Sequence, residues 1–555
     1  MRNPLFFLAL LFACVVVCAQ PKAVKGVFPS VASIVTYKNG VLNADGTAMF
    51  VGGNGDVVAS SRLFVGADSA VVIDNNGKAH PVERIVGIDN MFDCIKVRVS
   101  HEKKIKHVAS SAAKVNVGDE LYMLTYGVKK NALATPFKVL AVDSVYSLPY
   151  YTLDRPVQER YLSYPLLNSN GEFVALMQPS SANDTVKSYA IGSMLSASLA
   201  STTKDYGKGF YSGMGIRTAL PEAKDDALSC LYMQAMMGDS TSWLCAVNDY
   251  IASFPQSYEG YQSLAEYTAI YYRDMSQADK AWEKALALAE NKDEIYFGKG
   301  KVINEIVLSG DSVSHPMLSF DNALEQIDKA ILLNSRSLYI NYKADMLYRM
   351  HRFAEALECY ELLALGDMRG PEVFAKASQC HVNMNNLNKA VELLDSAVAC
   401  FENKEKDAAA YILTRGIVKS SAKRYREAVQ DMNSYEELVG GMLAAEFYYM
   451  REQAEINCKM YQQALNDIET ALAIAPDNLL YYLEKGMLCY RVKLTDEGIR
   501  TMLKACELAP DFADAHYLIG RLYMQKENIA EARKSLEKAE ILGHSDARVQ
   551  LDSLE

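Results

Sequence analysis

The sequence predicts a protein of two parts, an all-β N-terminal domain followed by an all-α array of repeated helical hairpins. Two observations predict this division. Up to about residue 200, short runs rich in Val, Ile, Phe and Tyr alternate with turns of Gly, Asn and Asp, which is typical of a barrel or a sandwich. From about residue 221 the hydrophobic period becomes helical, and the sequence repeats itself. A chain of 555 residues is also too long for one ordinary core.

The β part is expected to contain many short strands. The predicted strands are Ser30–Tyr37, Thr47–Val51, Val57–Ser60, Ala70–Ile73, Glu83–Ile88, Cys94–Val99, Leu121–Tyr126, Pro165–Leu167 and Phe173–Met177. Between the last two, Asn170-Gly171 predicts a tight turn. Residues 201–220 are mixed in composition and contain several glycines, so we interpret them as a linker.

The N-terminus has the features of an export signal. Arg2 supplies a positive charge, Leu5 to Val17 is apolar, and Val17-Cys18-Ala19 offers a cleavage site before Gln20. Residues 1–19 are therefore predicted to be a signal peptide, and the mature protein to be exported, either periplasmic or secreted. A lipoprotein cleavage box ending at Cys14 is the less favoured alternative, because apolar residues continue past it.

Composition restricts the possible ligands. The 57 Lys and Arg residues against 68 Asp and Glu residues give a formal net charge of −11, which argues against a basic nucleic-acid-binding surface. His, Cys, Asp and Glu do not cluster at the spacing of metal ligands, so we expect neither a metal site nor a cofactor. No later stretch is long and apolar enough to be a transmembrane segment.

Five stretches of the β part resemble, in the family's order, the HtrA-type branch of trypsin-like serine proteases. They are Val57–Asp68, Asp89–Val97, Val117–Leu121, Pro165 with the Asn-Gly turn that follows it, and Ser188–Ile191. The resemblance covers most of residues 28–200. It implies that this region is a trypsin-like, protease-like double barrel.

Carried over residue by residue, the resemblance places the family's catalytic histidine at Arg62, its aspartate at Asp93 and its serine at Leu162. A guanidinium stays protonated and cannot act as a general base, and leucine has no nucleophilic atom. The flanking glycines correspond to Ser163 and Tyr164, whose side chains fit poorly in an oxyanion-hole turn. The resemblance therefore implies a degenerate site and a pseudoenzyme.

Ser163, one position beyond the family's serine, is the alternative nucleophile. It would need a base, and the histidines of this domain, His80, His101 and His107, do not fall at the base position. We expect them to be exposed residues at strand ends or turns. An active serine endopeptidase whose repeats recruit substrates stays open as the alternative.

The helical part repeats at a fixed interval. Gly486 and Gly520 are 34 positions apart, as are Pro476 and Pro510. Each unit is predicted to be two amphipathic helices with small residues where they cross. The other small residues at such crossings are Gly416, Gly498, Ala278, Ala285, Ala323, Ala330, Ala344, Ala356, Ala390, Ala397, Ala428, Ala464, Ala471, Ala505, Ala532 and Ala539. This pattern resembles the tetratricopeptide repeat (TPR), and implies a TPR solenoid of roughly eight helical hairpins over residues 221–555.

In tetratricopeptide repeats the first helix of each unit lines a concave groove. The matching C-terminal positions are Tyr449, Gln453, Leu483, Met487, Tyr490, Tyr517 and Arg521, and the earlier ones are Asn341, Asp345, Gln379, Leu413 and Ile417. The C-terminal set is aromatic and aliphatic and lacks the Lys/Asn set with which some members clamp a C-terminal carboxylate. The resemblance implies a protein or peptide ligand with apolar anchors. The alternative is that these side chains pack only against neighbouring units.

Cysteine usage does not indicate a metal site. Eight of the nine cysteines beyond the signal lie singly in the helical part, where we expect small packing residues. Cys230 and Cys245 lie about level across a predicted hairpin and are a candidate disulfide, since export permits one.

The sequence thus favours an exported, non-catalytic scaffold that combines an inactive protease-like domain with a partner-binding solenoid. A structural component of the cell envelope, anchored by the β domain and spaced by the solenoid, is a third hypothesis. The sequence does not indicate the oligomeric state.

Overall fold

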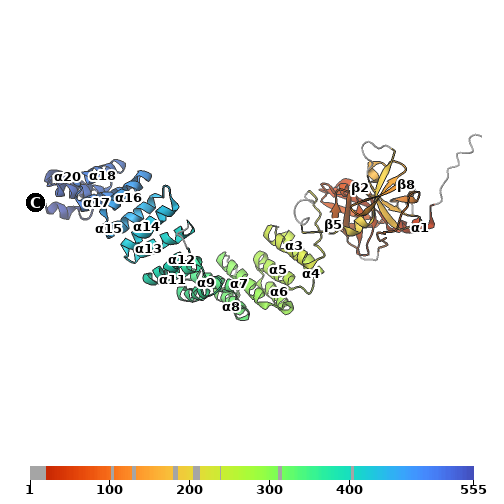
Figure 1. Ribbon diagram of the computed structural model, residues 1–555, viewed down its shortest axis with the longest axis horizontal. Coiled ribbons are helices and arrows are strands. Elements are labelled where there is room, and N and C mark those ends of the chain that lie inside the picture. The colour runs from red at the N-terminus through yellow and green to blue at the C-terminus, as the bar shows by residue number, and fades with distance from the viewer. Residues whose placement is uncertain are drawn as a thin grey trace, which may run out of the picture. The chain divides into compact units, whose positions relative to one another are not determined.

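The computed structural model describes residues 20–101, 105–127, 133–178, 186–203, 213–237, 239–310, 315–401 and 406–554. The chain forms two compact units, Met1–Glu290 and Asn291–Glu555. The first unit holds two β-barrels and the first helical hairpins, and the described elements of the second are helices (Figure 1). The predicted signal peptide lies outside the described residues.

Six antiparallel strands close the first barrel in the order β1-β2-β3-β6-β5-β4. They are β1 (Val31–Lys38), β2 (Val41–Phe50), β3 (Asp56–Ala59), β4 (Ser69–Ile73), β5 (Ala79–Asp89) and β6 (Cys94–Val99). Because side chains alternate between the two faces of a strand, every second residue points into the barrel. Ile34, Phe50, Val72, Ile85 and Val97 fill this interior and are fully buried.

The second barrel has the same size and closes in the order β10-β11-β12-β9-β8-β7. Its strands are β7 (Glu120–Thr125), β8 (Leu133–Val145), β9 (Leu148–Leu153), β10 (Pro165–Leu167), β11 (Phe173–Gln178) and β12 (Ser188–Gly192). Leu121, Val139, Leu153, Leu166 and Met177 form its core. Two closed barrels agree with the predicted double-barrel architecture.

The two barrels share a hydrophobic cluster. Met49 and Cys94 of the first barrel pack in it with Leu124 and Ile191 of the second. The short helix α1 (Lys22–Val27) adds the fully buried Val24. Asp93 lies between Phe92 and Cys94 of this cluster, and Ser163 of the second barrel donates to the Asp93 carbonyl.

Each predicted strand overlaps an observed one, and the β8–β9 hairpin is an element that the sequence does not predict. Val145 of β8 pairs with Leu148 of β9, so the loop between the strands has two residues. These residues, Tyr146 and Ser147, have positive φ angles of 48° and 64°. Such left-handed loops are normally signalled by Asn-Gly. Tyr-Ser gives no such signal, whereas the predicted turn at Asn170-Gly171 is present, with Gly171 at φ 78°.

Part of the predicted linker is bound to the first barrel. The backbone N–H of Ile85 donates to the carbonyl of Arg217 at 2.8 Å, and that of Ala219 donates to the carbonyl of Ile85 at 2.7 Å. Ile216 is buried in the barrel's core cluster. Residues 213–220 are therefore an extension of the barrel rather than a spacer, and residues 204–212 lie outside the described part of the chain.

The helical part contains nine hairpins within the described residues. In the first unit they are formed by α3 (Lys224–Met237) with α4 (Ser240–Ser253), and α5 (Tyr258–Tyr267) with α6 (Met275–Leu288). In the second unit the pairs are α7 (Lys292–Leu308) with α8 (Phe320–Leu333), α9 (Ser337–Arg349) with α10 (Phe353–Leu365), α11 (Pro371–Asn383) with α12 (Leu387–Ala399), α13 (Ala409–Ser421) with α14 (Tyr425–Val439), α15 (Ala445–Asn457) with α16 (Tyr461–Ile474), α17 (Leu479–Val492) with α18 (Thr495–Leu508), and α19 (Ala513–Gln525) with α20 (Ile529–Ile541). The short α21 (Ala547–Asp552) packs on α20.

Small residues lie where the paired helices cross, as predicted. A Cβ added to Gly520 would lie 2.6 Å from Leu536 Cγ, and one added to Gly486 would lie 2.7 Å from Met502 Cε. Ala532 and Ala539 are fully buried. Close helix approach therefore depends on these positions.

The candidate disulfide is absent, because Cys230 and Cys245 are free thiols. The α3–α4 hairpin closes instead through a cluster that contains Ala227, Leu231 and Val247 and neither cysteine. Among the described helices, none combines the length and apolar character that a membrane crossing requires.

Candidate functional site

Asp93, which is predicted from the sequence to stand at the aspartate position of the protease family, holds a neighbouring turn together. It lies between β5 and β6 at φ 49° and is buried. Its carboxylate accepts hydrogen bonds from Ser60 Oγ at 2.6 Å, Ser61 Oγ at 2.7 Å and the backbone N–H of Arg62 at 3.0 Å. These three donors come from the segment that follows β3. The carboxylate is thus used to fix this segment, not to orient an imidazole.

Ser163 also makes structural hydrogen bonds, through both its side chain and its backbone. Its side chain is buried, its backbone has φ 60°, and its Oγ donates to the carbonyl of Asp93. Its backbone N–H donates to the carbonyl of Met177 at 2.8 Å. A hydroxyl has one proton to donate, and here it is held by a carbonyl that cannot act as a base.

The other two predicted positions differ in exposure. Leu162 follows the turn at Glu159–Tyr161, and only 3% of it is exposed. The Arg62 side chain is exposed and pairs with Glu159. Arg62 therefore contacts Asp93 only through its backbone, and the three triad-derived positions do not form a side-chain relay.

The histidines of the barrels lie away from this network. His80 is buried, against the expectation of an exposed residue, because it packs edge-on to Phe50 and its Nε2 lies 3.3 Å from Asp74. His101 is half-buried and His107 is exposed. Neither these three nor any other described histidine hydrogen-bonds with Asp93 or Ser163.

The predicted groove residues converge at the C-terminal end of the array. Five of the seven, Leu483, Met487, Tyr490, Tyr517 and Arg521, line one cavity of about 450 Å³ between α17 and α19. They come from the first helices of two successive hairpins, at helical spacing, so they share one face.

Arg521 is the centre of this cavity. Its Nη2 donates to the Tyr490 hydroxyl at 2.7 Å and its Nη1 donates to the Tyr517 hydroxyl at 3.2 Å. The guanidinium also lies 4.9 Å from the centroid of the Tyr490 ring. These contacts fix the orientation of Arg521 across the two repeats.

The cavity is also lined by four residues outside the predicted set: Arg491, Asp514, Leu518 and His544. Helical spacing from Arg521 could have found Leu518, three positions before it, and Asp514, seven positions before it. No pattern points to His544, which follows α20, yet its ring stacks on Tyr517 at 3.9 Å and its Nε2 lies 3.4 Å from Asp514.

Three of the remaining groove positions contact side chains of the array itself, Tyr449 and Asp345 on other helices and Gln453 on its own helix. The Tyr449 ring packs 5.3 Å from that of Tyr481, and Gln453 Nε2 donates to Glu452 at 2.7 Å. Asp345 accepts from Tyr360 at 2.5 Å and from Lys376 at 3.0 Å. These contacts agree with the packing alternative for these three positions.

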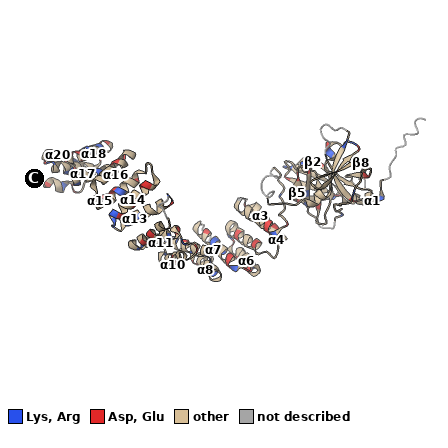
Figure 2. Ribbon diagram, viewed as in Figure 1, with Lys and Arg blue, Asp and Glu red and all other residues tan. Residues whose placement is uncertain are grey.

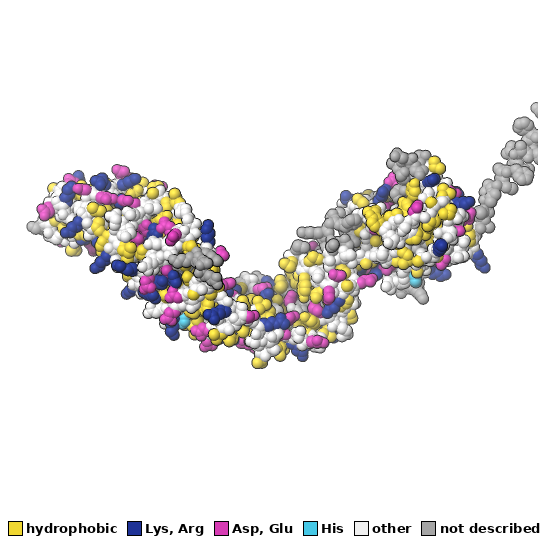
Figure 3. Space-filling view, viewed as in Figure 1, with side chains coloured by type: hydrophobic (Ala, Val, Ile, Leu, Met, Phe, Trp, Pro, Cys, Tyr) yellow, Lys and Arg dark blue, Asp and Glu magenta, His cyan; other side chains and the backbone are white. Residues whose placement is uncertain are grey.

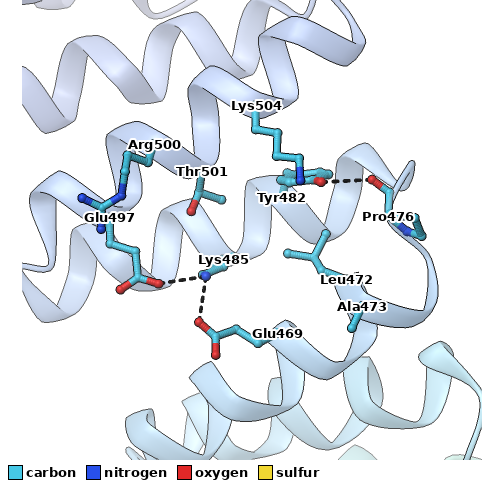
Figure 4. A pocket seen from close by; sticks show the side chains of 10 residues that line it. All are labelled: Glu469, Leu472, Ala473, Pro476, Tyr482, Lys485, Glu497, Arg500, Thr501 and Lys504. Carbon is cyan, nitrogen blue, oxygen red and sulfur yellow. Dashed lines mark hydrogen bonds and ion pairs between the residues drawn. The ribbon is translucent and has the colours of Figure 1, made fainter.

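A second cavity of about 520 Å³ lies among α16, α17 and α18 (Figure 4). At its floor Lys485 lies 2.8 Å from both Glu469 and Glu497. Burial lowers the pKa of Lys485, but hydrogen bonds to the two carboxylates outweigh it, and the pKa is raised. The ammonium of Lys485 is therefore already paired with the carboxylates of Glu469 and Glu497.

Charged groups are mixed along the repeats. Figure 2 shows Lys and Arg interspersed with Asp and Glu on the helices, and Figure 3 shows hydrophobic side chains among them on the visible face. The described residues contain no group of three His, Cys, Asp or Glu side chains that could hold a metal ion.

Comparison with known proteins identifies the repeat. Residues 513–540 match the tetratricopeptide repeat model. A TPR repeat-containing protein of Methanocaldococcus jannaschii is 25% identical over 247 residues, which are 43% of this chain and 41% of that protein. The chain thus matches less than half the length of this curated relative.

Solved structures resemble both parts. A protease of M. tuberculosis in its active form aligns with 33% of this chain and 84% of its own, at 17% identity and a TM-score of 0.29. A serine endoprotease of Yersinia pestis aligns with 32% and 62%, at 16% identity and a TM-score of 0.28. YrrB, described as a TPR protein with an unusual peptide-binding site, aligns with 36% and 99%, at 20% identity and a TM-score of 0.30.

Proposed function

We propose that this protein is an exported, non-catalytic scaffold that binds protein partners through the groove of its repeats. The observation that carries this proposal is the cavity between α17 and α19, where first-helix side chains from two repeats line an open space. Leu483 and Met487 offer apolar contact there, and Met487 is 42% exposed. Such apolar anchors beside a few oriented polar groups suit a peptide segment.

The β part, in this proposal, has no protease activity. Ser163 donates its proton to a backbone carbonyl, and the Asp93 carboxylate is occupied by two hydroxyls and an N–H. A serine nucleophile needs a base within hydrogen-bonding reach, and none of the described histidines bonds to Ser163. The rival function is serine endopeptidase activity, and covalent labelling of Ser163 by a fluorophosphonate would favour it.

Export is the second element of the proposal. The apolar run from Leu5 to Val17 supports it. Expression of the full chain followed by N-terminal sequencing of the exported fraction tests it, with Gln20 as the expected first residue. Retention of an uncleaved chain inside the cell would contradict it.

The binding function is tested by selecting a displayed random heptapeptide library against the full chain. We expect enriched peptides that lose binding to Met487→Trp, because the larger side chain fills the cavity from an exposed position. Leu503→Trp is the matched control, since Leu503 on the neighbouring α18 is 47% exposed and does not line the cavity. Failure of any peptide to enrich would remove the proposed function.

A further inference from the structure

The polar groups of the cavity between α17 and α19 are mostly hydrogen-bond donors. The hydroxyls of Tyr490 and Tyr517 each accept an N–H of Arg521, so the proton of each hydroxyl remains available for a ligand. Arg521 keeps further N–H groups beyond these two bonds. Arg491 adds a second, exposed guanidinium, which pairs with no carboxylate among the described residues.

The one carboxylate of the cavity already has a neighbour. Asp514 lies 3.4 Å from His544 Nε2. Two guanidiniums and two phenol protons therefore face one carboxylate, so the cavity favours a ligand that is negatively charged and rich in acceptors. A planar guanidinium matches the geometry of a carboxylate with two parallel hydrogen bonds.

The rest of the wall is apolar. Leu483 and Met487 face it from α17 and Leu518 from α19, while the stacked rings of Tyr517 and His544 form a flat surface. A volume of about 450 Å³ accommodates one or two side chains of a peptide, not a folded domain.

We propose that this cavity binds a short acidic segment of a partner protein, in which an apolar side chain stands next to an Asp or Glu. The apolar side chain packs against Leu483, Met487 and the Tyr517 ring. The neighbouring carboxylate accepts hydrogen bonds from Arg521, with Arg491 adding attraction from the rim. This inference rests on the proposed function and specifies its ligand by charge complementarity.

The test uses the peptides enriched from the random heptapeptide library against the full chain. We expect an acidic residue beside an aliphatic or aromatic one in the enriched set. In fluorescence polarisation, changing that acidic residue to its amide should weaken binding about tenfold or more, and raising the salt concentration should weaken it further. Arg521→Gln should give a similar loss.

Opposite charges at one exposed position separate charge recognition from misfolding. Met487→Glu should weaken binding of the acidic peptide more than Met487→Lys does, because both variants lose the apolar contact but only the glutamate repels the carboxylate of the peptide. Leu503→Glu on α18 should leave binding unchanged. Thermal melting of each variant checks folding. Enriched peptides without an acidic residue, or equal effects of Met487→Glu and Met487→Lys, would overturn the inference and leave the proposed function standing. Failure of any peptide to enrich would remove both.

Discussion

Lys419 Nζ lies 2.9 Å from the carboxylate of Asp431, and in the next repeat the same two positions hold Glu455 and Asp467. In both repeats an arginine also binds the aspartate, Arg415 in one and Arg451 in the other. The α15–α16 repeat has thus exchanged one buried cation for a buried carboxyl. Glu455 Oε2 consequently has no hydrogen-bond partner.

The same repeat carries a second buried carboxyl. Glu452 occupies the position that is Gly416 in the preceding repeat and Gly486 in the following one. It is fully buried, and its Oε1 has no partner. Burial raises the pKa of Glu452 to about 8, and burial with the nearby charge of Asp467 raises that of Glu455 to about 8.

This pair predicts a stability that falls as the pH rises. Both carboxyls have a higher pKa in the folded than in the unfolded state, so the folded protein binds more protons between about pH 4.5 and pH 8. The unfolding free energy is therefore unaffected by this pair below about pH 4.5 and falls progressively as the pH rises to about 8. Between pH 6 and pH 9 the second unit should lose up to about 5 kcal/mol of unfolding free energy, roughly half of it from each carboxyl. Thermal melting measures this loss, with the Glu452→Gln/Glu455→Gln variant as the control that should respond less. Equal slopes for the two proteins would contradict the prediction.

The local exchange also predicts a stabilising substitution. Glu455→Lys restores the residue type found at Lys419 and places an ammonium near Asp467. It should raise unfolding free energy by about 1–2 kcal/mol, because it replaces an unpartnered carboxyl with a hydrogen-bonded cation. Chemical denaturation of the full chain measures the change. The reciprocal variant Lys419→Glu should be destabilised, and stabilisation by both would show that charge pairing is not the cause.

The repeat could be predicted from the sequence because its signal is periodic. Gly520, Gly486 and the buried alanines recur at a fixed interval, and this interval fixes helix pairs and their shared face. Glu452 interrupts the same pattern, because it stands where the adjacent repeats have glycine. Its burial could not be predicted from the sequence, since it depends on the helices that pack around it. His544 reaches the cavity from outside the repeat, where no periodic signal exists.

The barrels were predicted less completely, since strand pairing is non-local. β8 and β9 were missed because Tyr146-Ser147 is not a turn signal, and the pairing of Arg217 and Ala219 with Ile85 joins residues far apart in sequence. His80 was expected to be exposed because its burial depends on Asp74 and on Phe50 across the barrel. The three triad-derived positions were located by resemblance, yet their actual hydrogen bonds required coordinates.

Gly520→Leu should destabilise the last hairpin. The added side chain would meet Leu536 Cγ, which lies 2.6 Å from the position of a Cβ, so overpacking should cost about 1–3 kcal/mol. Thermal melting followed by circular dichroism measures the loss. Gly366→Leu is the control, because the nearest atom to its added Cβ is 3.7 Å away. Similar melting of the two variants would contradict the packing role of Gly520.

Asp249 joins the helical hairpins of the first unit to the barrel. Its carboxylate lies 3.4 Å from Arg84 and 3.3 Å from Arg217, which belong to β5 and to the segment paired with it. Asp249→Ala would leave the largely buried guanidinium of Arg84 without this partner, so stability should fall by about 1–3 kcal/mol. Hydrogen exchange should rise at residues 214–219. Unchanged exchange there would show that the pair does not anchor this segment.

Ser163→Ala separates a structural from a catalytic role. The variant loses the buried hydrogen bond from Oγ to the carbonyl of Asp93, so unfolding free energy should fall by about 1–2 kcal/mol. The wild-type protein should neither turn over casein nor react with a fluorophosphonate, and the substitution should change neither result. The matched variant Ser61→Ala, which removes a donor to the Asp93 carboxylate, should destabilise by a similar amount. Labelling of the wild type that disappears in Ser163→Ala but persists in Ser61→Ala would instead establish Ser163 as a working nucleophile, because both variants lose similar stability and only one of them loses the labelled hydroxyl.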